Sequence, residues 1–188
     1  LIGLNNSKGI PAGIMGVRAE TGGSVEIMLL RRVETGIWSA LVRPGRTVRA
    51  GTKISVQGQE IHVLEDWPDG ERLLFVPDES LIREAGEMPL PPYIHQPLVD
   101  RSRYQTIYAQ SEGSVAAPTA GLHFTEEMLE KLIQMGVRLT WVTLHIGLDT
   151  FRPVEEENPR DHKIHSEYFE FGEDVAEQVR LAHQERRR

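Results

Sequence analysis

Between residues 13 and 76 the sequence is a series of short apolar segments separated by turn residues, and this series constrains the fold more than any other feature. Glycine and proline recur at the breaks, as Gly22-Gly23, Pro44-Gly45 and Pro68-Asp69-Gly70. Short strands that follow one another every 8–12 residues or roughly so are typical of a small closed barrel or a sandwich. The expected strands cover residues 25–30, 37–42, 52–56, 60–65 and 72–76.

Beyond residue 77 the pattern changes from strands to an alternation of helices and strands. Residues 78–86 predict a short helix, and the proline-rich segment 88–93 that follows is stiff enough to be a domain boundary. Helices are then expected at 126–135 and 173–187, with a buried strand at 137–144 between them, and this order is α/β in character.

The apolar start of the chain predicts a strand that belongs with this second region. We therefore expect a mixed α/β and β fold: an α/β domain of residues 1–11 and 93–188, with a small β-barrel domain of residues 12–92 inserted in it. The chain opens inside an apolar run and ends on an amphipathic helix pattern without a partner, so it is expected to be part of a longer protein.

Charge and cysteine content exclude several classes of function. The sequence has no cysteine, which excludes disulfides and a cysteine nucleophile and suits a cytoplasmic protein. No segment reaches the apolar length of a membrane span. The net charge of −7 argues against broad nucleic-acid binding, which needs a positive surface. The sequence still has one basic cluster, formed by Arg43, Arg46, Arg49 and Lys53. This cluster is either a local RNA contact or a solvated hairpin with charges on an edge strand.

A loop of small residues from Gly113 to Gly121 leads past His123 into an expected helix start. Small residues let a ligand approach the backbone, and the first N–H groups of a helix are unpaired donors. Thr125 is a good N-cap residue for this helix, and Gly136 suits its end. The loop therefore predicts a floor for a polar or anionic small molecule, although a tight strand-to-helix connection is the plainer interpretation.

Histidines follow the next strand and recur near the end of the chain. His145, Gly147 and Thr150 follow the strand at 137–144, at the carboxyl end where open α/β sheets bind ligands. The later segment His162-Lys163-Ile164-His165-Ser166-Glu167 would suit two ligands and a carboxylate on a metal, or a general acid/base pair of His165 and Glu167. The acid/base pair requires fewer side chains to meet in the fold than a metal site does, so no metal is predicted.

At these residues the chain resembles the S-adenosylmethionine:tRNA ribosyltransferase-isomerase family of queuosine biosynthesis. The run Ser-Val-Ala-Ala-Pro-Thr-Ala-Gly-Leu-His-Phe-Thr at 114–125 is highly specific, and the similarity extends more loosely through residues 5–76. The other matching segments occur in the order of the family, at residues 86–94, 104–108, 143–154 and 162–167.

The resemblance implies an enzyme that transfers and isomerises the ribosyl group of S-adenosylmethionine, its co-substrate, onto 7-aminomethyl-7-deazaguanine in the tRNA anticodon. Epoxyqueuosine would form, and adenine and methionine would leave. A base must then remove a proton beside the sulfonium, and adenine must be protonated as it leaves; histidine suits both roles at neutral pH. The expected catalytic residues are His123, His145, His165 and Glu167.

Substrate contacts follow from the same resemblance. Tyr104 or Phe124 would stack on adenine or on the target base. The expected substrate-binding residues are Tyr104, Pro118, Thr119, Ala120, Gly121, Phe124, Gly147 and Thr150, and the expected tRNA contacts are Arg43, Arg46, Arg49 and Lys53. The protein is expected to act as a cytoplasmic monomer.

The chain departs from the family pattern near its start. Lys8 and Gly13 stand where the family pattern has arginines, so one planar guanidinium fork becomes an ammonium and a second cation is absent. Two alternatives stay open, the first favoured by these departures and the second by the 162–167 segment. One is a truncated or inactive nucleotide- or RNA-binding remnant of the family, and the other is a metal-dependent hydrolase that uses His162, His165 and Glu167.

Overall fold

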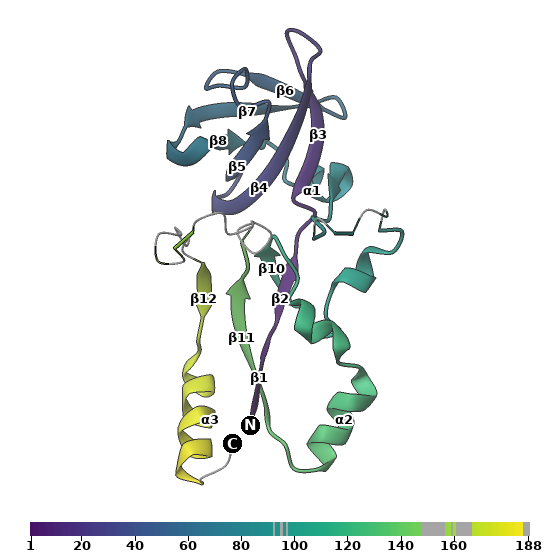
Figure 1. Ribbon diagram of the computed structural model, residues 1–188, viewed down its shortest axis with the longest axis vertical. Coiled ribbons are helices and arrows are strands. Elements are labelled where there is room, and N and C mark those ends of the chain that lie inside the picture. The colour runs from purple at the N-terminus through teal and green to yellow at the C-terminus, as the bar shows by residue number, and fades with distance from the viewer. Residues whose placement is uncertain are drawn as a thin grey trace. The chain divides into compact units, whose positions relative to one another are not determined.

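The computed structural model describes residues 1–91, 93–94, 96, 98–147, 157–158, 160 and 167–185. The chain divides into two compact units, Leu1–Gly9 with Gln96–Arg188 (unit 1) and Ile10–His95 (unit 2). Each unit is built around its own strands, most of which are labelled in Figure 1.

Unit 2 is a closed barrel. Six strands pair antiparallel in the order β3-β4-β5-β8-β7-β6, and β6 pairs with β3 again, so the sheet closes on itself. The two-residue strand β9 adds to β3, and helix α1 precedes it. The barrel elements are β3 (Gly13–Arg18), β4 (Ser24–Glu34), β5 (Ile37–Arg43), β6 (Lys53–Val56), β7 (Gln59–Asp66), the 3-10 turn Pro68–Gly70, β8 (Glu71–Phe75), α1 (Ser80–Ala85) and β9 (Gly86–Glu87).

Apolar side chains, which alternate with polar ones along the strands, fill the interior of the barrel. Ile54, Ile61 and Leu74 are fully buried, and their neighbours in sequence point outwards, as expected for strands with one covered face. Gly16 of β3 is required for close packing, because a Cβ there would lie 2.8 Å from the side chains of Ile54 and Val56. The predicted barrel is confirmed, and of its six closing strands β3 is the one without a predicted counterpart.

Glu79, just before α1, ties the strands β4 and β5 to the end of the barrel. Its carboxylate accepts hydrogen bonds from Arg32 Nε (2.9 Å) and Nη2 (2.7 Å), from the Gly36 N–H (3.0 Å) and from Trp38 Nε1 (2.9 Å). Partial burial opposes ionisation of Glu79, but these hydrogen bonds outweigh it and hold its pKa below the ordinary value.

Acid should therefore weaken the barrel through Glu79. A lowered pKa in the folded state gives stability that is fully present above the unfolded pKa, near 4.5, and is lost as the pH falls through the folded pKa. Glu79→Gln should cost about 2 kcal/mol at pH 7 and flatten the loss of stability below pH 4.5. Urea unfolding at pH 7 and at pH 3.5 or so measures both effects, and an unchanged acid slope in the variant would contradict this role.

Unit 1 contains two small sheets. β11 lies between β1, which it pairs with in parallel, and β12, which it pairs with antiparallel, while β10 and β2 form a separate parallel pair. Helix α3 contacts β11, and Figure 1 shows α3 following β12 along the chain. The elements are β1 (Ile2–Asn5), β2 (Ser7–Gly9), the 3-10 helix η2 (Arg101–Tyr104), β10 (Ser111–Ser114), the 3-10 helix η3 (Thr119–His123), α2 (Glu126–Gln134), β11 (Leu139–His145), β12 (Tyr168–Glu170) and α3 (Glu173–Gln184).

The ends of α2 follow the predicted signals. Thr125 caps the helix, since its hydroxyl oxygen accepts the Met128 N–H at 3.2 Å, and Gly136 beyond the last turn has a φ of 80°. The apolar stripe of α2 is not covered within the described residues, where the helix has no buried residue and Ile133 is 58% exposed. The predicted strand at 137–144 and the predicted terminal helix are present as β11 and α3.

Candidate functional site

Three segments of unit 1 that are distant in sequence meet at the carboxyl end of β11. Val115 N–H donates to Ile146 O at 3.0 Å, and Ile146 N–H donates to Ser114 Oγ at 2.9 Å. The Ser114 hydroxyl in turn donates to Ala116 O at 2.6 Å. The loop after β10 and the loop after β11, both predicted as ligand-binding segments, are therefore bonded to each other.

His145, the last residue of β11, lies at the centre of this junction. Its ring stacks on Tyr168 of β12, with 5.5 Å between ring centroids and 18° between the planes. Gly113 packs against the same ring, since a Cβ at Gly113 would lie 3.0 Å from Nε2 of His145. The Nδ1 atom is buried and has no hydrogen-bond partner among the described residues. These contacts fix the plane of the imidazole.

The electrostatic setting of His145 favours the neutral ring. Burial lowers the pKa of His145 from its ordinary value, and the nearby Glu170 carboxylate opposes that shift without cancelling it. Tyr168 hydroxyl donates to Glu170 Oε1 at 2.6 Å, a hydrogen bond that raises the pKa of Tyr168 and orients the phenol over the imidazole. At neutral pH the imidazole of His145 is therefore able to accept a proton.

Side chains that the sequence analysis did not select hold β11 in place. The Asn5 side chain donates to Leu144 O at 2.9 Å and accepts the Leu144 N–H at 3.0 Å, like an added strand residue. Asn6 Oδ1 accepts the hydroxyl of Thr143 at 2.7 Å. The signal was present in the sequence, because two amides directly follow an apolar strand, but their partners lie about 140 residues away.

Glu167 is joined to the loop that follows His145 by a hydrogen bond to the backbone. Its Oε1 accepts the N–H of Gly147 at 2.9 Å, two residues beyond His145, and the side chain is otherwise open to solvent. The carboxylate is therefore placed at the same loop as the imidazole, without a direct contact between the two among the described residues.

His123 lies apart from His145. It ends the 3-10 helix η3, its side chain is exposed, and its Nδ1 lies 3.1 Å from Ala120 O. No hydrogen bond or ring contact joins it to His145 within the described part of the chain. Of the predicted substrate contacts around it, Thr119 and Ala120 are exposed, Pro118 and Phe124 are half-buried, and Gly121 is buried.

At the two glycines that bound the small-residue loop, side chains of the protein occupy the space where a Cβ would lie. Gly113, with a φ of 138°, makes room for the His145 ring. At Gly121 a Cβ would lie 2.3 Å from the Tyr108 hydroxyl oxygen and 2.8 Å from the Thr106 methyl group. Tyr108 also contacts Phe124 and Trp141, with ring centroids 6.5 and 5.1 Å away.

Gly121→Ala should therefore displace the loop that carries Pro118–His123. Tyr108 is 9% exposed and packed among aromatic rings, so it cannot swing away without losing those contacts. We expect a loss of about 2 kcal/mol in stability, measured by urea unfolding. The double variant with Tyr108→Phe, which removes the crowded oxygen, should recover at least half of it; no recovery would show that another contact is responsible.

The remaining predicted residues divide into two groups. Tyr104 is 5% exposed, so its ring is covered by the protein, whereas Gly147 lies on the His145 loop. Thr150, His165 and also His162 lie outside the described residues. No cluster of three metal-ligating side chains occurs in the parts of the chain that are described.

The predicted tRNA contacts all belong to unit 2, at the end of β5 and the start of β6. Arg43 and Arg49 form loose ion pairs with Glu26 (3.7 Å) and Asp66 (3.6 Å). Lys53 pairs more closely with Glu60, at 3.1 Å. All of these pairs are largely exposed to solvent, where such pairs hold little energy and can exchange partners.

No helix among the described residues is long and apolar enough to cross a membrane.

Comparison with known proteins gives consistent matches. The family model described as "Queuosine biosynthesis protein" matches residues 1–188. A protein of Dehalococcoides mccartyi strain CBDB1, named S-adenosylmethionine:tRNA ribosyltransferase-isomerase, is 53% identical over 171 residues, which are 88% of this chain and 50% of that protein. A protein of the same name from Halothermothrix orenii is 46% identical over 96% of this chain and 54% of its own length.

A solved structure also matches. A crystal structure of an S-adenosylmethionine tRNA ribosyltransferase from Thermotoga maritima is 30% identical to this chain and covers 99% of it and 49% of the Thermotoga chain, with a TM-score of 0.39. The present chain spans about half the length of the curated relatives that it matches.

Proposed function

Because this chain belongs to the queuosine biosynthesis protein family, we propose that the protein transfers and isomerises the ribosyl group of S-adenosylmethionine onto 7-aminomethyl-7-deazaguanine in a tRNA anticodon. The products are epoxyqueuosine in the tRNA, adenine and methionine. The main structural support for the proposal is the junction at His145. There the 113–116 loop is hydrogen-bonded to the end of β11, and Tyr168 of β12 stacks on the His145 ring.

In this proposal His145 is the base that removes a proton from the carbon beside the sulfonium. A neutral imidazole with a fixed plane suits that step, because it offers a lone pair at neutral pH without reorganisation. Glu167, on the same loop, orients the substrate or shares the proton. His123 is assigned to the departing adenine, and His165 remains a candidate for either proton transfer.

The substrate contacts in the proposal come from η3 and from the His145 loop. Pro118, Thr119, Ala120 and Gly121 supply backbone to S-adenosylmethionine, and Phe124 offers a half-buried ring for a base. Gly147, Thr150 and Tyr104 complete the proposed set, and a contact of the Tyr104 ring with substrate would require movement of the residues that cover it. No metal takes part.

The domain assignment belongs to the same proposal. Residues 1–11 and 93–188 are assigned to an α/β domain, supported by the parallel pairs β1–β11 and β2–β10 and by the helices α2 and α3. Residues 12–92 are the inserted barrel, which presents Arg43, Arg46, Arg49 and Lys53 to tRNA. The protein acts as a monomer in the cytoplasm, where its tRNA substrate is found.

The departures near the start of the chain are compatible with this activity. Lys8 lies on β2 opposite Glu112 of β10, and its ammonium contacts that carboxylate at 3.0 Å. Gly13 begins β3, in register with Met28 and Glu87 of the neighbouring strands. Both residues thus have ordinary places in the fold.

Nucleoside analysis of the tRNA tests the proposal. The protein is incubated with S-adenosylmethionine and tRNA that carries the 7-aminomethyl-7-deazaguanine base, and the digested nucleosides are analysed by mass spectrometry. The proposal predicts epoxyqueuosine only when all three components are present. Binding of both substrates without product would favour a binding remnant instead.

A further inference from the structure

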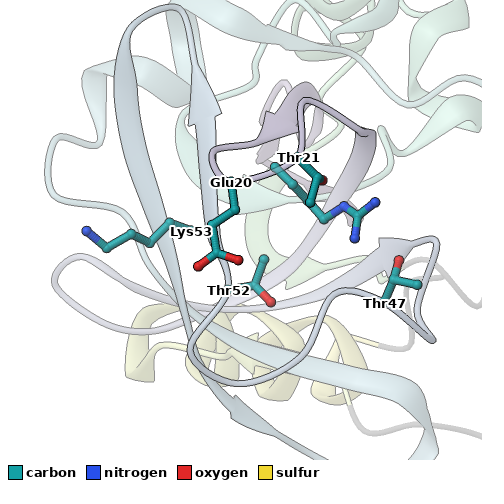
Figure 2. Close-up of a pocket in the computed structure, with 6 residues that line it drawn as sticks. Glu20, Thr21, Thr47, Thr52 and Lys53 are labelled. Atoms are coloured by element: carbon teal, nitrogen blue, oxygen red, sulfur yellow. The ribbon is translucent and has the colours of Figure 1, made fainter.

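A small cavity lies on the barrel between the β3–β4 hairpin and the segment that leads into β6. Its volume is about 60 Å³, and it is lined by Arg18, Glu20, Thr21, Thr47, Thr52 and Lys53. Figure 2 shows the Glu20 carboxylate directed towards Thr52, whereas the ammonium of Lys53 points away from the other side chains. The cavity adjoins the basic segment Arg43–Lys53 but contains a cation that the sequence analysis did not select, Arg18.

The guanidinium of Arg18 is held in place without an anionic partner. Its Nε is buried and has no hydrogen-bond partner among the described residues, and the side chain forms no ion pair with them. The backbone of Arg18 is fixed by hydrogen bonds with Gly23 and Gly22, both at 2.8 Å. A Cβ at Gly23 would lie 2.6 Å from Nη2, so the guanidinium packs over a glycine. A partly desolvated cation of this kind gains free energy when an anion binds to it.

The threonines around Arg18 have protons to donate. Thr52 Oγ1 accepts the Arg49 N–H at 3.0 Å, and Thr21 Oγ1 accepts the Gly23 N–H at 3.4 Å. A hydroxyl that accepts a backbone N–H still has its own proton for an acceptor. A planar guanidinium beside such hydroxyls matches the oxygens of a phosphate group, which it can bind in bidentate fashion.

One lining residue opposes an anion. The Glu20 carboxylate faces the cavity, and Glu60 already occupies the Lys53 ammonium at 3.1 Å. The phosphate would therefore depend mainly on Arg18, and Glu20 would limit its affinity. Loss of the Arg18 charge should therefore weaken binding, and loss of the Glu20 charge should strengthen it.

We propose that Arg18, with the hydroxyls of Thr21, Thr47 and Thr52, binds one phosphate group of the tRNA backbone. The inference rests on the proposed function for the identity of the RNA. An RNA backbone is favoured over a free phosphate because the adjoining segment carries Arg43, Arg46 and Arg49, whose exposed charges can contact further phosphates of the same strand.

The test compares tRNA binding by the wild-type protein, Arg18→Gln and Glu20→Gln across a series of salt concentrations. Loss of one guanidinium–phosphate contact should weaken binding by about tenfold near 0.1 M salt. It should also reduce the slope of log K against log salt by about 0.9. Glu20→Gln should tighten binding by a few-fold or so. Arg31→Gln is the matched control, because its guanidinium lies over the Trp67 ring outside the cavity, and it should leave the slope nearly unchanged.

The outcomes separate this site from the proposed function. If Arg18→Gln keeps the wild-type affinity and salt slope while the wild-type protein modifies tRNA, the phosphate site is wrong and the function stands. If the wild-type protein does not bind tRNA, both are wrong. Titration with inorganic phosphate alone, followed by NMR, separates the source of the ligand: an Arg18-dependent response without any effect of Arg18→Gln on tRNA binding would make the cavity a free-anion site and overturn the RNA assignment. Thermal unfolding confirms that each variant is folded.

Discussion

Replacement of His145 by alanine should lower the rate of adenine release by about 10²- to 10⁴-fold, the usual contribution of a general base. The imidazole is the only group among the described residues that combines a lowered pKa, a stacked ring and a place at the end of β11. The substitution removes a proton acceptor and leaves the backbone bonds of Ile146 with Ser114 in place. The variant should therefore stay folded.

The pH dependence of the wild-type rate tests the role of His145 independently. Burial lowers the pKa of His145, so activity should be retained below the ordinary imidazole value of 6.5 and lost as the pH falls through the lower folded pKa. Tyr168→Ala exposes the ring and should move this acid limb to higher pH, whereas Tyr168→Phe keeps the stack and should move it much less. His145→Ala with activity within a factor of three or so of the wild type would contradict the assignment.

Replacement of Arg72 by leucine should destabilise the barrel by about 3 kcal/mol, because leucine cannot replace the several hydrogen bonds of the buried guanidinium. Arg72 is 3% exposed, and its guanidinium pairs with Asp66 at 2.9 Å. It also donates to Val48 O at 3.0 Å and to Gly45 O at 2.8 Å, which lie in the basic segment before β6. Its removal leaves these carbonyl groups without their donor and takes from Asp66 its closest cation.

Urea unfolding measures this effect, with Arg49→Leu as the matched control. Arg49 also contacts Asp66, but at 3.6 Å and with an exposed side chain, so its loss should cost no more than about 1 kcal/mol. A similar small cost for Arg72→Leu would contradict the role of Arg72 as the support of the basic segment. A strong loss should also weaken tRNA binding, because the segment that carries Arg46 would no longer be held.

The barrel could be predicted from the sequence because its turns are marked by glycine and proline and its strands alternate. β3 was missed for a physical reason: Gly13 and Gly16 interrupt the apolar pattern, and Met15 and Val17 point to solvent with 59% and 43% exposure. Gly16 is small because the strand packs closely on β6, and such a contact between distant segments leaves no local signal.

The site could be predicted only in part. The loops at 113–121 and after residue 144 are visible as segments, but the filling of Gly113 by the His145 ring and of Gly121 by Tyr108 depends on tertiary packing. Tyr168 faces His145 because β12 pairs antiparallel with β11 in a register that places the two opposite each other. Spacing along the chain cannot supply that register.

Adenine release from S-adenosylmethionine in the presence of tRNA is the most direct test of the proposed transfer. The protein at its natural length is assayed with tRNA that carries the 7-aminomethyl-7-deazaguanine base and with the same tRNA without it. We predict release that requires the modified base and falls by at least a hundredfold or so in His145→Ala. Equal release with both tRNAs, or none from a folded protein that binds both substrates, would contradict the proposed function.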